Sequence, residues 1–182
     1  MRQLMREDPS VDVVWRAFEL RPEPVPTLDP NGVYLETVWR DSVYPLAKKL
    51  GIPIKLPPVQ PRSRRAHEAA HWARAQGRFD EYNTALFRAF FERGEDIGDV
   101  AVLTALARGL NLDADALALA LECRDFESAV GSDERDARQL GISAVPAFVA
   151  DRRARLSGVQ PVESVRRLIG KVREPASRTE EI

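Results

Sequence analysis

The pattern of apolar and polar residues changes character along the chain. Near the N-terminus, "VDVVWRAFEL" alternates around Val11, Val13 and Trp15 and is rich in β-branched and aromatic residues. This pattern predicts a strand from Val11 to Phe18. The next segment, "RPEPVPTLDPNG", is loaded with proline. Each proline lacks a backbone donor and restricts the residue before it, so we expect a loop here.

From Tyr34 to about Asp125 the pattern is helical, with apolar residues at three- and four-residue spacing in five successive segments. The first segment ends at Leu50, before Gly51, and Pro45 should kink or divide it. The residues expected to cap the helices that follow are Ser63, Asp80, Asp99 and Asp113.

The C-terminal part returns to a mixed pattern. After one more helix, "FESAVGSDERDARQL", two short β-type segments predict a hairpin, with strands at Ala147–Ala150 and Arg153–Leu156. "PVESVRRLIGKV" then opens with Pro161, a good first-turn residue, and predicts a final helix. The tail, residues 175–182, is expected to be disordered.

Composition narrows the class of protein. In 182 residues, 44% are hydrophobic and 30% charged, which is the balance of an ordered globular chain. A net charge of −1 argues against a nucleic-acid partner held by bulk electrostatics. The N-terminus, "MRQLMREDPS", lacks the apolar core of a secretion signal, and no run suits a bilayer, so we expect a cytoplasmic protein without a membrane partner. Cys123 is the single cysteine, which excludes an internal two-cysteine redox couple.

"RRAHEAAHWARAQGR" contains the H-E-x-x-H pattern of zinc proteases at His67, Glu68 and His71. In a helix, however, the alanines of this segment share one face, and the two histidines share theirs with Arg64 and Arg74. These are the only histidines in the chain, so a third ligand would have to be a carboxylate without a supporting motif. We therefore reject a metal site here and interpret the histidines as the flank of a packed helix.

Two further residues are candidates for chemistry. Cys123 is expected to lie within the alternating Ala/Leu run of a helix, where a lone cysteine behaves as a small hydrophobe. Pro146, in "GISAVPAF", stands at a strand start, where its missing donor is tolerated. Val145 could then present its backbone groups outward.

Five segments in order resemble the DsbA-like branch of the thioredoxin superfamily, in particular cytoplasmic members related to 2-hydroxychromene-2-carboxylate isomerases. The segments are "VVWRAFEL", "RRAHEAAHWA", "ALFRAFFERGEDIGD", "LGISAVPAFV" and "SGVQP". The resemblance implies an α/β chain with a thioredoxin-like fold and an inserted all-helical domain. Residues 1–33 and 126–174 would form the thioredoxin-like domain, and residues 34–125 the insertion.

The resemblance also implies a site. Val145 and Pro146 would form the family's cis-proline loop, whose backbone pairs with substrate, and His67 and His71 would border the substrate groove. Family members begin with a strand that ends in Cys-x-x-Cys, or in a serine variant, at a helix N-terminus that stabilises the thiolate. "MRQLMREDPS" resembles only the end of that helix. We therefore expect the first strand and every catalytic residue to be missing from this sequence, and the natural product to begin upstream of Met1.

Three functions remain open. The first is a DsbA-family thiol–disulfide oxidoreductase, inactive as this sequence stands, whose partners would be thiol- or disulfide-containing polypeptides. The second is a glutathione-dependent isomerase or transferase, with glutathione as a substrate and no bound cofactor. The third is a non-catalytic module that binds peptides or a partner subunit, in which exposed strand edges would favour β-augmentation or a homodimer.

Overall fold

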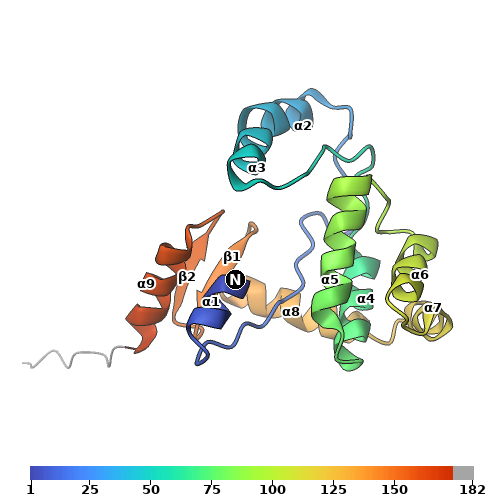
Figure 1. Ribbon diagram of the computed structural model, residues 1–182. Helices are drawn as coiled ribbons and strands as arrows, with labels where there is room; N and C mark the ends of the chain where they lie inside the picture. Colours follow the sequence, from blue (N-terminus) through green and yellow to red (C-terminus); the bar gives the residue numbers. More distant parts are fainter. Residues whose placement is uncertain (174–182) are drawn as a thin grey trace, which may run out of the picture. The chain divides into compact units, whose positions relative to one another are not determined.

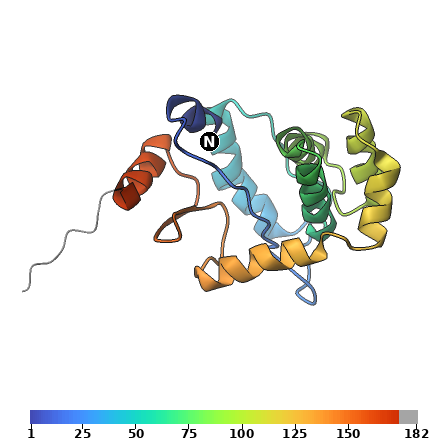
Figure 2. The ribbon, with the colours of Figure 1, turned by 90° about the horizontal axis from the view of Figure 1, so that it is seen from below.

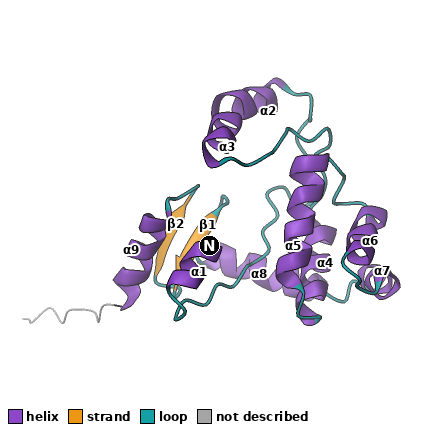
Figure 3. Ribbon diagram, in the orientation of Figure 1, coloured by secondary structure: helices purple, strands orange, loops and turns teal. Residues whose placement is uncertain are grey.

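The computed structural model describes residues 1–173 (Figure 1), and the predicted disorder of residues 175–182 lies outside them. The chain forms two compact units, one made of Met1–Leu20 together with the chain from Arg135 onward, the other of Arg21–Glu134. We call them unit 1 and unit 2. The assignment of these regions to a thioredoxin-like domain and a helical insertion stays a prediction. Most of the described chain is helical, and its sheet has two strands (Figure 3).

Unit 1 contains a β-hairpin with helices around it. Its elements are α1 (Arg2–Glu7), β1 (Ala147–Ala150), β2 (Ala154–Ser157) and α9 (Val162–Arg173). The strands are antiparallel, with Phe148 opposite Leu156, and α9 lies against both of them (Figure 1). Val165 and Leu168 form the buried face of α9, as the apolar spacing predicts.

The hairpin confirms the prediction with one shift. Asp151 and Arg152 both have positive φ, and Arg153 N–H donates to the Ala150 carbonyl, so these residues form a tight turn. Because Arg153 closes this turn, the second strand begins at Ala154 instead of Arg153.

The predicted strand from Val11 to Phe18 is wrong. Residues 8–32 contain neither helix nor strand in the described chain, and the sheet consists of β1 and β2. A β-type residue pattern makes a strand only where a neighbouring strand supplies the ladder of hydrogen bonds.

Unit 2 is helical. Its elements are α2 (Val33–Val38), the π-helical segment η1 (Trp39–Val43), α3 (Tyr44–Leu50), α4 (Arg64–Ala75), α5 (Phe79–Phe87), the π-helical segment η2 (Arg88–Arg93), α6 (Val100–Gly109) and α7 (Ala114–Glu122). Helix α8 (Glu127–Gln139) begins in unit 2 and ends in unit 1. Helices α4 to α7 pack on one another (Figure 2). No helix within residues 1–173 is long and apolar enough to cross a membrane.

Alanines of α4 allow this close packing. Ala69 and Ala73 are fully buried in a core that also holds Trp72, Tyr82 and Leu103, which confirms the predicted alanine face. Small side chains let neighbouring helices approach closely, so the larger side chains of α5 to α7 fill the space. The Tyr82 hydroxyl donates to the Leu103 carbonyl at 2.8 Å and ties α5 to α6.

Helix boundaries follow local chemistry with two exceptions. The first predicted helix is divided where Tyr44 N–H bonds to the Trp39 carbonyl, directly before Pro45, which has no N–H to donate. Asp99 and Asp113 cap α6 and α7 as predicted. The exceptions are Ser63 and Asp80. Ser63 has helical φ and ψ and makes no capping bond, and Asp80 lies inside the first turn of α5.

Candidate functional site

The loop before β1 presents Val145 and Pro146 at the surface of unit 1. The Val145–Pro146 peptide bond is cis, and both residues are exposed. The Pro146 carbonyl accepts a hydrogen bond from Gly158 N–H at 2.8 Å, which extends the hairpin by one pair. In the part of the chain that the structure describes, neither the N–H nor the C=O of Val145 has a hydrogen-bond partner. Val145 therefore offers one donor and one acceptor to an extended peptide.

Sequence features explain this geometry. Pro146 cannot donate a ladder bond, so it tolerates the position directly before Ala147, the first residue of β1. On the N-terminal side, Gly141 has a φ of 64° and ends α8 in the left-handed conformation that glycine adopts without strain. Arg155, on β2, donates to the Leu140 carbonyl at this helix end. The loop is thus held between the end of α8 and the start of β1.

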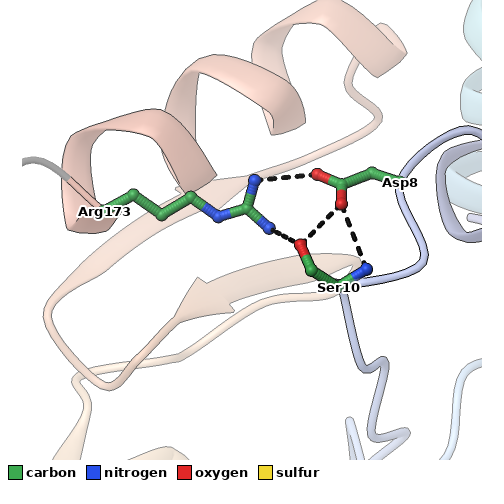
Figure 4. Close-up of polar contacts among 3 residues, drawn as sticks. All are labelled: Asp8, Ser10 and Arg173. Carbon is green, nitrogen blue, oxygen red and sulfur yellow. Dashed lines mark hydrogen bonds and ion pairs between the residues drawn. The ribbon is translucent and has the colours of Figure 1, made fainter.

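A contact of unit 1 holds its N-terminal segment to α9. Arg173 donates to Asp8 Oδ2 at 2.8 Å and to the Ser10 hydroxyl, while the Asp8 carboxylate also accepts from Ser10 (Figure 4). Arg166, two turns earlier on α9, pairs with Glu7. The Arg173 guanidinium and the Ser10 hydroxyl lower the pKa of Asp8 to about 2.

His71 lies in unit 2, on α4, and its partner comes from α8. Its Nε2 lies 3.0 Å from Asp133 Oδ2, and the side chains are 14% and 1% exposed. A carboxylate beside one ring nitrogen orients the imidazole. The pair can therefore hold the ring in one orientation.

Charged groups surround this pair on the same two helices. Arg64 Nη2 lies 3.4 Å from Glu134 Oε2, and Glu68 is 4% exposed. Burial, and secondarily the charge of Glu127, raise the pKa of Glu68 above its ordinary value. We call Arg64, Glu68, His71, Asp133 and Glu134 the α4–α8 polar cluster.

The H-E-x-x-H residues do not form a ligand set in the structure. Glu68 belongs to the buried face of α4, whereas His71 points to Asp133. Among residues 1–173, no group of three or more His, Cys, Asp or Glu side chains is arranged to hold a metal ion. The rejection of a metal at His67, Glu68 and His71 stays a prediction that elemental analysis tests.

Cys123 corrects another expectation. We interpreted it as a small hydrophobe packed within a helix, but it is exposed and lies directly after the last residue of α7. The apolar run of α7 ends at Leu121, so the cysteine falls outside the packed face. In the described chain, Cys123 is a free thiol at the surface of unit 2.

Sequence reasoning missed Asp133 and Glu134. A signal for Asp133 exists in the sequence, because it lies three residues after Val130 and four before Ala137, on the apolar face of α8. A carboxylate on a buried face needs a hydrogen-bonding partner. The predicted residues divide between the units, with Val145 and Pro146 in unit 1 and His67 and His71 in unit 2.

Comparisons with known proteins agree with the fold. The family model of the "DSBA-like thioredoxin domain" matches residues 1–170, so the chain belongs to the DsbA-like thioredoxin domain family. YwbO of Bacillus subtilis (strain 168), whose name describes it as an uncharacterized protein, is 39% identical over 144 residues, or 77% of this chain and 72% of YwbO.

Two solved structures are similar to the chain. One is a probable DsbA oxidoreductase, SCO1869, from Streptomyces coelicolor, with a TM-score of 0.78 and 25% identity over 96% of this chain and 83% of the other. The second is a 2-hydroxychromene-2-carboxylate isomerase, with a TM-score of 0.73 and 15% identity over 94% and 86% of the two chains. The fold is therefore the DsbA-like thioredoxin fold, with a small two-stranded sheet in the described residues.

Proposed function

We propose that the protein acts in thiol–disulfide chemistry of the DsbA type by binding thiol- or disulfide-containing polypeptides at the Val145–Pro146 loop. We also propose that the 182 residues do not complete a redox cycle by themselves. The observation that carries the proposal is the pair of free backbone groups at Val145, beside Pro146 and in line with β1. Membership of the DsbA-like family supports the choice of substrate class.

The backbone geometry supports polypeptide binding. An extended peptide can place one residue opposite Val145, accept from its N–H and donate to its C=O, as adjoining strands do. Backbone pairing recognises any sequence, so it suits a protein that acts on many polypeptides. The exposed side chains of Val145 and Val149 add apolar contact area beside this pairing.

Electron balance limits what this chain can do. In disulfide reduction, a thiolate attacks the substrate disulfide, forms a mixed disulfide and releases one substrate thiol; a second thiol then displaces the other. The chain contains one cysteine, Cys123, which can form a mixed disulfide but cannot resolve it within the chain. A resolving thiol must therefore come from another molecule or from residues outside this sequence.

Reduction of insulin by dithiothreitol tests the redox half of the proposal. We expect the wild-type chain and the Cys123→Ser variant to leave the rate at the uncatalysed background. Insulin precipitation well above background with the wild-type chain would refute the claim that these residues do not complete the cycle. The Cys123→Ser variant then shows whether that turnover depends on the cysteine.

Glutathione provides the test between the redox function and the isomerase alternative. The likeness to the isomerase structure concerns the fold alone, so we rank this function second. We expect the insulin B chain to bind more tightly than S-methylglutathione. The opposite order of affinities would favour a glutathione-dependent isomerase or transferase.

A further inference from the structure

An apolar groove opens on the surface of unit 2 at the end of α5. It has a volume of about 290 Å³ and is lined by Ile52, Ile54, Thr84, Phe87, Arg88, Phe91 and Glu92. We call this surface the Phe87 face. Its volume lies just below the range of roughly 300–1,000 Å³ that is typical of small-molecule pockets, which suits one inserted side chain better than a cofactor.

The Phe87 face also carries a protruding aromatic ring. Phe87 is 50% exposed, and its ring stacks on Phe91 with centroids 6.2 Å apart. Phe91 in turn contacts the rings of Trp39 and Phe90, so the base of the face is rigid. Ile52, which also lines the groove, is 48% exposed. A half-exposed Phe beside an apolar groove is a surface that association would bury with a gain in free energy.

Charges on the rim are matched in number and opposite in sign. Arg88 and Glu92 lie one helical turn apart, with Arg88 Nε and Glu92 Oε1 separated by 3.9 Å and both side chains largely open to solvent. A lipid surface or a nucleic acid would favour a basic rim, and a cationic peptide an acidic one. The rim formed by Arg88 and Glu92 has an excess of neither basic nor acidic side chains.

These features make the face complementary to itself. In a two-fold symmetric dimer, the same patch lies on both subunits, and a contact from residue i to residue j is repeated from j to i. If α5–η2 packed antiparallel to its copy, Phe87 of each chain would enter the groove of the other. Arg88 of each chain would then lie opposite Glu92 of its partner. A single face that holds both the ring and the groove, and both charges, meets the requirement of such an interface.

We propose that the occupant of the Phe87 face is a second copy of this chain, bound around a two-fold axis through the Phe87 rings and the crossed Arg88–Glu92 pairs. All residues of the proposed interface belong to unit 2, whereas Val145 and Pro146 belong to unit 1. A failure of dimerisation would therefore leave the proposed polypeptide binding unaffected, and the reverse also holds.

Sedimentation velocity over a concentration series, with charge-reversal variants, tests this proposal. Arg88→Glu alone sets Glu against Glu92 of the partner, and Glu92→Arg alone sets Arg against Arg88. We expect each single variant to weaken dimerisation at least tenfold, because like charges in apposition repel. An equimolar mixture of the two variants should recover the wild-type dimer, since every crossed pair then has opposite signs. A folding defect cannot be rescued by mixing.

Two further variants fix the location of the interface. Phe87→Asp should abolish the dimer, whereas Leu119→Asp, which places the same charge on α7 at a residue 60% exposed and outside the groove, should leave it unchanged. A wild-type chain that stays monomeric at every concentration overturns the proposal. So does a mixture of Arg88→Glu and Glu92→Arg that stays monomeric, or a dimer that survives Phe87→Asp.

Discussion

His71 Nε2 lies 3.0 Å from Asp133 Oδ2 and joins two helices whose contacting residues are 62 positions apart in the chain. Asp133 is 2% exposed, so its carboxylate depends on protein donors in place of water. This contact holds α4 against α8. It also makes the pair a sensitive point for the stability of unit 2.

Removing either partner should destabilise the chain. We expect His71→Ala and Asp133→Asn each to lower the free energy of unfolding by about 1–3 kcal/mol. In His71→Ala the buried Asp133 carboxylate loses a hydrogen-bonding partner, and in Asp133→Asn the imidazole loses its carboxylate. The loss in free energy of unfolding should be smaller for the double variant than the sum of the losses of the two single variants. Urea unfolding of all four chains gives the coupling energy.

An exposed ion pair is the control for this cycle. Arg78 Nε lies 2.9 Å from Glu81 Oε2, a similar distance, but both side chains are more than a third exposed. Glu81→Gln should change the free energy of unfolding by less than about 1 kcal/mol. Equal losses at Glu81 and Asp133 would contradict the role given to burial.

Two predicted helix caps, Asp113 and Ser63, differ in geometry and should differ in their contribution to the stability of the chain. Asp113 accepts from Asp115 N–H at 3.1 Å and from Ala116 N–H at 2.9 Å, so Asp113→Ala should cost about 1 kcal/mol. Ser63 makes no capping bond, and Ser63→Ala should cost almost nothing. Thermal and urea unfolding measure both. A larger loss at Ser63 than at Asp113 would show that the caps are assigned to the wrong residues.

Glu68 should destabilise the folded chain at neutral pH. Its pKa is higher in the folded state than in the unfolded chain, so folding favours its protonated form. The stability from this group is fully present below the unfolded pKa and is lost as pH rises through the folded pKa. We therefore expect Glu68→Gln to be more stable than the wild type at pH 7, with the difference vanishing in acid. A glutamine variant that is less stable at pH 7 would contradict this sign.

Asp8 should show the opposite dependence. Its pKa falls from 3.8 to about 2 on folding, chiefly through the hydrogen bond from Arg173. The contact therefore stabilises unit 1 above the unfolded pKa and is lost as pH falls from 3.8 toward about 2. In an NMR titration, Arg173→Gln should return the pKa of the Asp8 carboxyl toward its ordinary value. Arg167→Gln removes a charge from the same helix without a contact to Asp8 and should leave that pKa nearly unchanged.

Local patterns predicted most of the elements but not the contacts between them. The α4 to α7 helices follow from apolar spacing because that spacing is a property of each segment alone. The strand predicted at Val11–Phe18 is wrong, because an alternating apolar pattern also suits an extended segment outside a sheet. Cys123 failed by one residue, since an Ala/Leu run does not show where a helix ends.

The candidate site was predictable to a similar extent. Val145 and Pro146 were predicted as site residues from the resemblance to the DsbA-like family, because a proline at a strand start by itself indicates only an ordinary turn. Their role in binding stays a prediction. Asp133 was missed because its partner, His71, lies on a helix far away in sequence. The residue pattern of α8 alone does not identify that partner. The Phe87 groove was also missed, since its walls come from the segment after α3 and from α5–η2.

The most direct test of the account is the affinity of the insulin B chain for two variants at one position. Val145→Ala keeps the backbone N–H that is proposed to pair with polypeptide, whereas Val145→Pro removes it. We expect Val145→Pro to bind about tenfold more weakly than Val145→Ala, because both variants change the valine side chain but only Val145→Pro also loses one hydrogen bond of roughly 1–1.5 kcal/mol. Equal affinities for a folded Val145→Pro variant and the wild type would contradict backbone pairing at this loop.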